Sequence, residues 1–145
     1  MVEVVDGIFI RTVIFCEDVR QEAGNKTSLL GVLSADIIVG AVPAPIRLAL
    51  YMEGEATKPY RGPLNLRLRL DDQELLVAQG QLNAQPGLAI LPIPQMVVVI
   101  PKVGILRVDI GKDPDNWHEV GAKKILVGTL KDGAFIPSSV SEQPS

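Results

Sequence analysis

The sequence predicts an all-β protein, a single antiparallel β-sandwich of about eight strands with an immunoglobulin-like or C2-like outline. Apolar residues recur at every second position along most of the chain, which is the period of a half-buried strand. Turn-forming Gly, Pro, Asn and Asp residues separate these runs roughly every eight to twelve residues. The best helical candidate, residues 18–26, is stopped by Gly24 within about two turns.

The predicted strands differ in how many of their faces are apolar. Residues 45–55, 63–72 and 104–110 alternate apolar and polar positions, and we expect one face of each to be buried. Other segments are apolar on both faces, which is typical of central strands or of strands covered at an interface. These segments are residues 7–16 (GIFIRTVIFC), 29–39 (LLGVLSADIIV) and 95–100 (QMVVVI).

The first two strands are predicted to form a hairpin, and charged residues interrupt it around a turn at residues 24–25. With a two-residue loop, the register places Asp18 opposite Gly31. One interpretation is a solvent-exposed ladder of Asp18, Arg20 and Glu22, each contact contributing about a few tenths of a kcal/mol. The other is a partly buried polar clasp made by Asp18 and Arg20, with Gly31 allowing close approach. The exposed ladder is the favoured interpretation.

We expect one domain over residues 1–136, followed by a disordered tail over residues 137–145. The chain has 14 Lys and Arg residues and 17 Asp and Glu residues, so its net charge is −3. No block of like charge suggests nucleic acid or a lipid surface as a partner. The first residues carry acidic rather than basic side chains before the apolar run, so no secretion signal is predicted.

Residues 75–101 contain no charged residue and are long enough to span a bilayer. They also contain five Gln or Asn residues and four Pro residues. A helix with so many breaks would leave backbone groups unsatisfied in lipid. The segment is therefore predicted to be two strands and a loop, and no membrane partner is expected.

The residues that most often perform catalysis are nearly absent. His118 is the only histidine, so one chain cannot build a multi-histidine metal site, and a surface or partly packed loop position is favoured for it. Cys16 is the only cysteine and lies in an apolar run, which favours a small buried residue over a thiolate nucleophile. A chain without an internal disulfide suits a reducing compartment, so a cytoplasmic location is expected. We identify no hydrolase or nucleotide motif and predict no catalytic residue, metal or cofactor.

Several acidic residues lie in or near predicted loops, where carboxylates gathered at one end of a sandwich can bind calcium. Ordinary turn chemistry is the favoured explanation, because Asp and Asn are common turn formers and the spacing is not that of an EF-hand. The residues are Asp71, Asp72, Asp109, Asp113 and Asp115.

Four arginines occupy outward positions of the alternating strands and define a candidate basic face that, with Tyr51, would bind phosphates or a carboxylate-bearing partner. They are Arg47, Arg67, Arg69 and Arg107. A solvated face of mixed charge is favoured over this anion site, since acidic residues such as Glu53 and Asp109 alternate with the arginines.

The segment CEDVRQE at residues 16–22, followed by a short turn and SLLGV at residues 28–32, resembles the N-terminal signature of an uncharacterised family of small bacterial proteins known as a domain of unknown function. The resemblance covers roughly the first third of the chain. It implies a compact standalone bacterial domain. It implies no activity, substrate, cofactor or site residue.

Together these features predict a non-enzymatic binding or assembly module that acts through protein–protein contacts. Strands with two apolar faces in so small a domain suggest that another subunit covers part of the surface, so a homodimer is the preferred partner hypothesis. The alternatives are a calcium- or anion-binding sandwich and a small enzyme that uses polar residues near Asp18 and Arg20.

Overall fold

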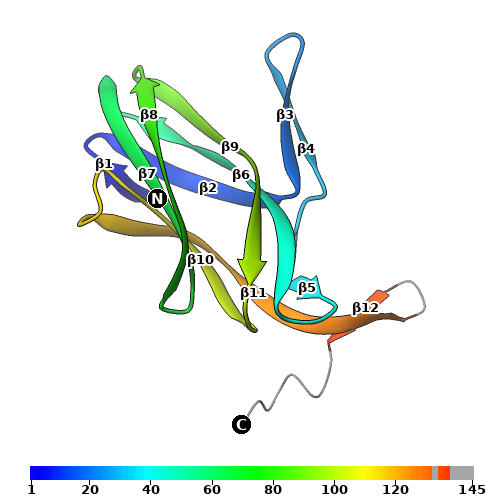
Figure 1. Cartoon of the computed structure of the whole chain (residues 1–145). Coiled ribbons are helices and arrows are strands. Elements are labelled where there is room, and N and C mark those ends of the chain that lie inside the picture. The colour runs from blue at the N-terminus through cyan, green and yellow to red at the C-terminus, as the bar shows by residue number, and fades with distance from the viewer. Residues whose placement is uncertain (132–133, 138–145) are drawn as a thin grey trace.

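A computed structural model describes residues 1–131 and 134–137. The described residues form twelve β-strands and no helix (Figure 1). This confirms the predicted all-β class, but the strands outnumber the eight expected and lie in three sheets. The strands are β1 (Val2–Val5), β2 (Ile8–Cys16), β3 (Asp18–Glu22), β4 (Lys26–Leu30), β5 (Ile37–Val39), β6 (Ala44–Ala56), β7 (Tyr60–Leu70), β8 (Gln73–Ala84), β9 (Gly87–Ile100), β10 (Gly104–Gly111), β11 (Trp117–Lys131) and β12 (Ala134–Pro137).

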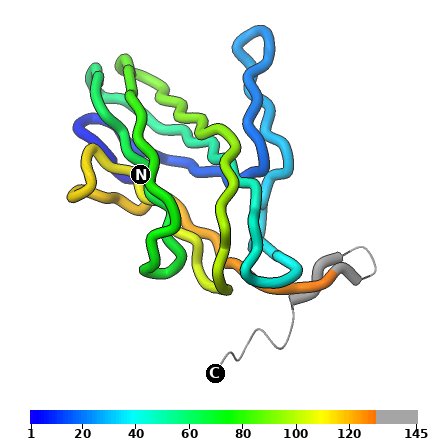
Figure 2. Tube along the Cα trace, viewed as in Figure 1, coloured from blue at the N-terminus to red at the C-terminus, as the bar shows by residue number. Residues whose placement is uncertain are grey.

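Two larger sheets face each other across one hydrophobic core (Figure 2). The first has the strand order β1-β2-β6-β9 and is antiparallel throughout. The second has the order β12-β11-β10-β7-β8, and β5 adds a short parallel pairing to β11. The strands β8 and β9 follow each other in the chain but end up in different sheets.

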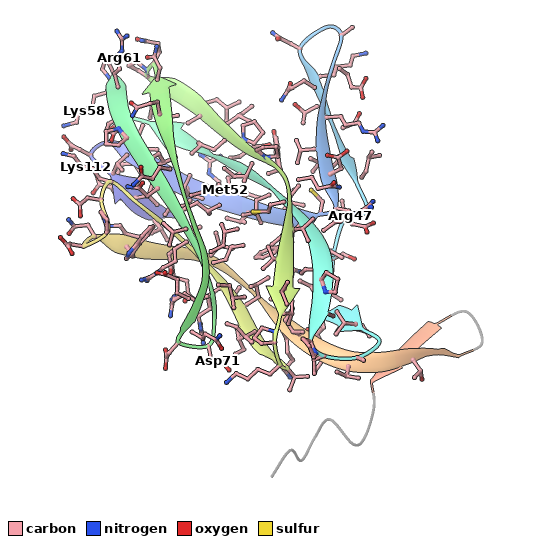
Figure 3. All side chains as sticks on the ribbon, viewed as in Figure 1. Arg47, Met52, Lys58, Arg61, Asp71 and Lys112 are labelled. Carbon is pink, nitrogen blue, oxygen red and sulfur yellow. The ribbon has the colours of Figure 1, made fainter. Side chains whose placement is uncertain are left out.

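The core includes the inward positions of the three alternating segments, as predicted, together with buried residues of β1, β2, β5, β9 and β11. Each contributes three fully or almost fully buried apolar side chains: Leu48, Leu50 and Met52 from β6, Leu66, Leu68 and Leu70 from β7, and Leu106, Val108 and Ile110 from β10. Figure 3 shows Met52 between the two sheets. Sheets with one buried face are expected to alternate in this way. No helix in the described part of the chain is long and apolar enough to cross a membrane, and residues 75–101 form β8, β9 and their connection.

The segments that are apolar on both faces do not all form continuous strands. Residues 7–16 become the central strand β2, in which the fully buried Cys16 thiol donates to the carbonyl oxygen of Ala49 at 3.6 Å. Burial raises the pKa of the Cys16 thiol, as suits an inert core residue. The strand predicted over residues 29–39 is wrong, because Gly31 takes a φ of +62° and the chain then bends through exposed residues before β5 begins.

The strands β3 and β4 form a separate two-stranded sheet, here called the arm (residues 18–30), which extends away from the two larger sheets (Figure 1). The predicted hairpin exists, but its register was wrong by one residue. The loop takes three residues, 23–25, so Glu22 faces Lys26 and Asp18 faces Leu30.

The first two strands of the chain, β1 and β2, form another hairpin, which the sequence did not reveal. Its turn is at Asp6–Gly7, where Gly7 takes a φ of +79°. At the other end of the chain, Pro137 ends β12 instead of starting the expected tail. The remainder of the predicted tail, residues 138–145, lies outside the described residues.

Candidate binding site

The strand β9 is a free edge of the first sheet. In its middle, the set of positions that face the core shifts by one residue. It pairs with β6 alone, and Pro94 and Gln95 of β9 lie opposite the single residue Ala49 of β6. A bulge of this kind inserts one extra residue and reverses which positions face inward. Accordingly, Leu91 is buried on one side of the bulge and Val98 on the other.

The outward positions of β9 carry four large aliphatic side chains, which we name the β9 strip. Their exposed fractions are 64% for Leu88, 43% for Ile90, 64% for Val97 and 58% for Val99. The described residues include eight large apolar residues that are at least 39% exposed, and half of them belong to this one strand. Such clustering indicates a contact surface, because scattered apolar side chains are normal but contiguous patches are unusual.

The charges beside the β9 strip are separated by sign along its length. On the neighbouring strand β6, Glu53 and Glu55 are paired with residues 88–90 of β9, whereas Arg47 is paired with Val97. Arg47 is exposed and lies on the side of the molecule where the arm begins (Figure 3). Glu55 also forms an ion pair with Arg11 of β2, so the uncompensated charge at this end comes from Glu53, beside Ile90, and the charge at the other end comes from Arg47, beside Val97. We call these the acidic end and the basic end of the strip.

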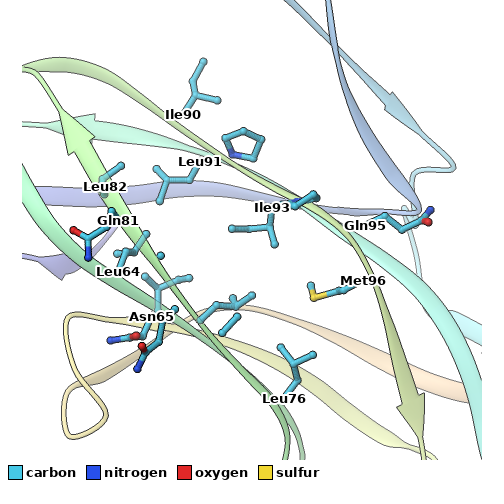
Figure 4. Close-up of a pocket in the computed structure, with 17 residues that line it drawn as sticks. Leu64, Asn65, Leu76, Gln81, Leu82, Ile90, Leu91, Ile93, Gln95 and Met96 are labelled. Carbon is cyan, nitrogen blue, oxygen red and sulfur yellow. The ribbon is translucent and has the colours of Figure 1, made fainter.

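A cleft of about 490 Å³ lies on the other side of β9, between this strand and β8 (Figure 4). The cleft arises because the inward positions of β8 carry the small residues Ala78 and Gly80, which are paired with Leu66 and Leu64 of β7. A Cβ atom built on Gly80 would have no atom of another segment closer than the carbonyl oxygen of Leu64, at 3.9 Å. Between Leu76 and Leu82, β8 thus has no large inward side chain to fill the space opposite β9.

The lining of the cleft is aliphatic, and its polar members are uncharged. Large apolar side chains come from both sheets: Leu64, Leu66, Leu76, Leu82, Ile90, Leu91, Ile93, Met96 and Ile110. The polar lining residues are amides: Asn65, Gln79, Gln81 and Gln95. A concave apolar site with a few polar groups is the usual form of a small-molecule binding site.

The candidate basic face proves to be a network of ion pairs on the outer face of the second sheet. Arg67 Nε and Arg69 Nε donate to Asp109 Oδ2 at 2.8 and 2.6 Å, and Arg69 Nη2 donates to Oδ1 at 3.1 Å. Arg69 and Arg107 also donate to Glu119 Oε1, at 3.0 and 3.1 Å. The Arg67 guanidinium lies 4.7 Å from the centroid of the Trp117 ring, within cation–π range.

Asp109 is the buried centre of this network, with a side chain only 1% exposed. Burial by itself opposes ionisation of this carboxyl, but the hydrogen bonds and charges of Arg69 and Arg67 outweigh it, so the pKa of Asp109 lies below its ordinary value. The hydrogen bond to Asp109 in turn raises the pKa of Arg69. The arginines are therefore engaged with carboxylates and hold strands β7, β10 and β11 together.

Arg47 does not belong to this network, and its expected grouping with the other three arginines is wrong. It lies on β6 in the first sheet, whereas Arg67, Arg69 and Arg107 lie on β7 and β10 in the second. Alternation places a residue on the outside of a strand but does not tell which sheet the strand joins. Tyr51 is also on β6, where its hydroxyl donates to Glu53 at 2.9 Å.

The charged residues of the arm are exposed except for Asp18, which is half-buried. Arg20 Nε donates to Asp18 Oδ2 at 3.0 Å, but the Arg20 side chain is 62% exposed and that of Asp18 is 28% exposed. Glu22 is exposed at the end of β3, facing Lys26. An ion pair this open to solvent contributes about 0–1 kcal/mol, so the favoured exposed ladder describes the arm better than a buried clasp.

The acidic loop residues act mainly in turns. Asp113 accepts from the backbone N–H of Asp115 at 2.9 Å and from the amide of Asn116 at 3.0 Å, which lowers the pKa of Asp113. Asp71 Oδ1 accepts from the backbone N–H of Ile105 at 3.0 Å. Within the described ranges, no three Asp, Glu, His or Cys side chains are grouped as metal ligands. His118 is exposed at the start of β11 and not in a loop.

Sequence reasoning missed both the cleft and the part that Glu119 plays in the ion-pair network. The signal for the cleft is weak but present, since Ala78 and Gly80 are small residues at inward positions of a strand. Comparison of the chain with protein-family models matches none, and a search of curated proteins finds no match. The resemblance of residues 16–32 to an uncharacterised bacterial family therefore stays a prediction.

Proposed function

We propose that this chain is a non-enzymatic assembly module of the bacterial cytoplasm that acts through protein–protein contacts and self-associates as a homodimer through the β9 strip. The observation that carries the proposal is the concentration of Leu88, Ile90, Val97 and Val99 on the outer face of one strand, each at least 43% exposed. Covering such a surface removes apolar area from water, which favours association by roughly 25 cal/mol per Å² before the costs of binding.

The charges beside the strip favour a second copy of this chain as the occupant. A two-fold axis across the strip would place Glu53, at the acidic end, against Arg47, at the basic end, of the other copy, while Glu55 stays paired with Arg11 of its own chain. The same pair of contacts would form twice, once on each side of the axis. A surface that is complementary to itself in this way needs no second kind of protein.

The polar groups of the described residues support a non-enzymatic role. Arg67, Arg69 and Arg107 are bound by carboxylates, and the cleft lining contains no group that titrates near neutral pH. General acid–base and nucleophilic catalysis both need such groups within reach of a substrate. The only cysteine, Cys16, is fully buried, which suits a protein that works under reducing conditions.

Charge reversal tests the proposed homodimer. We expect Arg47→Glu and Glu53→Arg each to weaken self-association at least tenfold, because each places like charges opposite each other in a two-fold pair. An equimolar mixture of the two variants should recover dimers, since the introduced glutamate of one chain would then meet the introduced arginine of the other. Sedimentation velocity across micromolar concentrations measures both effects.

The melting temperature of each variant shows whether it remains folded. Wild-type protein that sediments as a monomer over the whole concentration range would refute the homodimer. Dimers that form equally well in the single variants would show that the interface lies elsewhere. A mixture that stays monomeric although both variants are folded would refute the two-fold pairing of Arg47 with Glu53.

A further inference from the structure

We propose that the cleft between β8 and β9 binds one linear aliphatic chain that carries an uncharged head group. This inference does not require self-association, because Ile90 is the one residue that the lining of the cleft shares with the β9 strip. The ligand we have in mind is a single-chain alcohol, ester or amide taken up from solution.

The cleft runs along parts of two strands, which suits a linear ligand. Its walls include Leu76 and residues 78–82 of β8 and residues 90–96 of β9, about half of each strand, and the two strands diverge from their connection (Figure 4). Seven residues of extended chain cover about 20 Å at roughly 3.3 Å per residue. The volume of about 490 Å³ falls within the usual range for small-molecule sites.

The lining selects against a charged ligand. None of the residues that line the cleft is Asp, Glu, Lys, Arg or His. A carboxylate or ammonium placed there would lose hydration without meeting an opposite charge, which is strongly unfavourable. The polar lining groups lie at the rim, because Gln95 Nε2 donates to the carbonyl oxygen of Glu17 at 2.8 Å and Gln79 and Gln81 alternate with the inward Ala78 and Gly80. An uncharged head group would therefore sit at the open side of the cleft, where water can complete its hydrogen bonds.

The free edge of β9 also selects against an inserted peptide strand. A strand placed between β8 and β9 would need hydrogen bonds from both edges. Pro92 and Pro94 lie in this part of β9, and prolines within a sheet turn their nitrogen toward the unpaired side, where they offer no N–H. A hydrocarbon chain needs no such partner, so it is the better match for this wall.

Filling the cleft tests the assignment. Gly80→Leu places a bulky side chain at an inward position where a Cβ meets nothing of another segment closer than 3.9 Å, so the fold should tolerate it. We expect wild-type protein to bind the neutral dye Nile red, dodecanol to displace the dye, and Gly80→Leu to weaken dodecanol binding at least tenfold. Gly40→Leu is the matched control, since Gly40 is exposed and an added Cβ there has no atom within 4 Å.

Charge and shape selectivity complete the test. Dodecanoate should bind at least tenfold more weakly than dodecanol, and equal affinity would overturn the proposal. The proposal also fails if dodecanol does not displace the dye, if Gly80→Leu binds like wild type, or if only an alternating apolar peptide displaces the dye. Cosedimentation with uncharged phosphatidylcholine vesicles that is equal for wild type and Gly80→Leu, without dodecanol binding, would assign the apolar contact to a bilayer instead.

A melting temperature for Gly80→Leu at or above the wild-type value shows that lost binding is not lost folding. Should this variant melt at a lower temperature, Ala78→Val fills the same wall with a smaller change, and the same tenfold loss is expected. Binding by a folded Ala78→Val variant that equals wild type would then overturn the proposal.

Discussion

The outer faces of the two larger sheets differ in the side chains that they present to solvent. On the second sheet, arginines and carboxylates of three strands bind one another around Asp109. On the first sheet, Glu53 and Arg47 lie beside opposite ends of the β9 strip, and the aliphatic side chains of the strip stay exposed. A face that satisfies its own polar groups needs no partner, whereas a face that exposes apolar area gains free energy when one covers it.

The largest expected effect comes from removing the centre of the ion-pair network. Asp109→Ala leaves Arg67 and Arg69 without their buried partner, and we expect a loss of roughly 3 kcal/mol in the free energy of unfolding. This is the low end for a broken buried pair, because both arginines retain some exposure and Arg69 keeps Glu119. Urea denaturation measures the change.

Asp72→Ala is the matched control for that variant, because Asp72 also approaches Arg69, at 3.9 Å, but is fully exposed. It should leave the denaturation midpoint unchanged. Similar losses in both variants would show that the network contributes by its overall charge and not by the buried pair.

Acidification should gradually remove the contribution that ionised Asp109 makes to the free energy of unfolding. The pKa of Asp109 is lower in the folded state than in the unfolded chain, so its contribution is complete above about pH 4, the ordinary value for Asp, and is lost as the pH falls through the folded-state value. The difference in unfolding free energy between wild type and Asp109→Asn should therefore be constant at neutral pH and shrink below about pH 4. A difference that stays the same down to about pH 3 would contradict this account.

A smaller effect, confined to assembly, is expected on the other face. Val97→Lys adds a second positive charge beside Arg47 at the basic end of the β9 strip and should weaken self-association by about tenfold to a hundredfold, or roughly 1.4–2.7 kcal/mol, as measured by light scattering. Val77→Lys is the control, since Val77 is 44% exposed on β8, outside the strip. If the two variants shift the mass equally, added charge and not the strip governs association.

Much of the fold could be predicted from alternation alone. The inward leucines of β6 and β7 and the outward positions of Arg67 and Arg69 follow from a period of two, which is a local property. Strand order is not local, and for this reason Arg47 was grouped with arginines of another sheet. The cleft was out of reach for the same reason, because it depends on β8 and β9 joining different sheets after a tight connection.

Local conformation accounts for the remaining differences. The three-residue loop of the arm shifted the register by one, and the positive φ at Gly31 ended a strand that composition alone would continue. In the ion-pair network, Glu119 reaches the arginines because a bulge between β10 and β11 places it opposite Asp109. Bulges leave no clear mark in a single sequence.

The bulge in β9 also has a consequence for which changes the chain can tolerate. Because Pro94 and Gln95 lie opposite one residue of β6, the halves of the strand keep opposite parity, and both halves of the β9 strip still reach the same outer face. Deleting one of these two exposed residues would restore one-to-one pairing with β6, with Val97 and Val99 still outward and Val98 and Ile100 still inward. Deleting a residue from the regular part of β9, between Met96 and Ile100, would instead turn part of the strand over, so the bulge is the one place in β9 where the loss of a residue is expected to be tolerated.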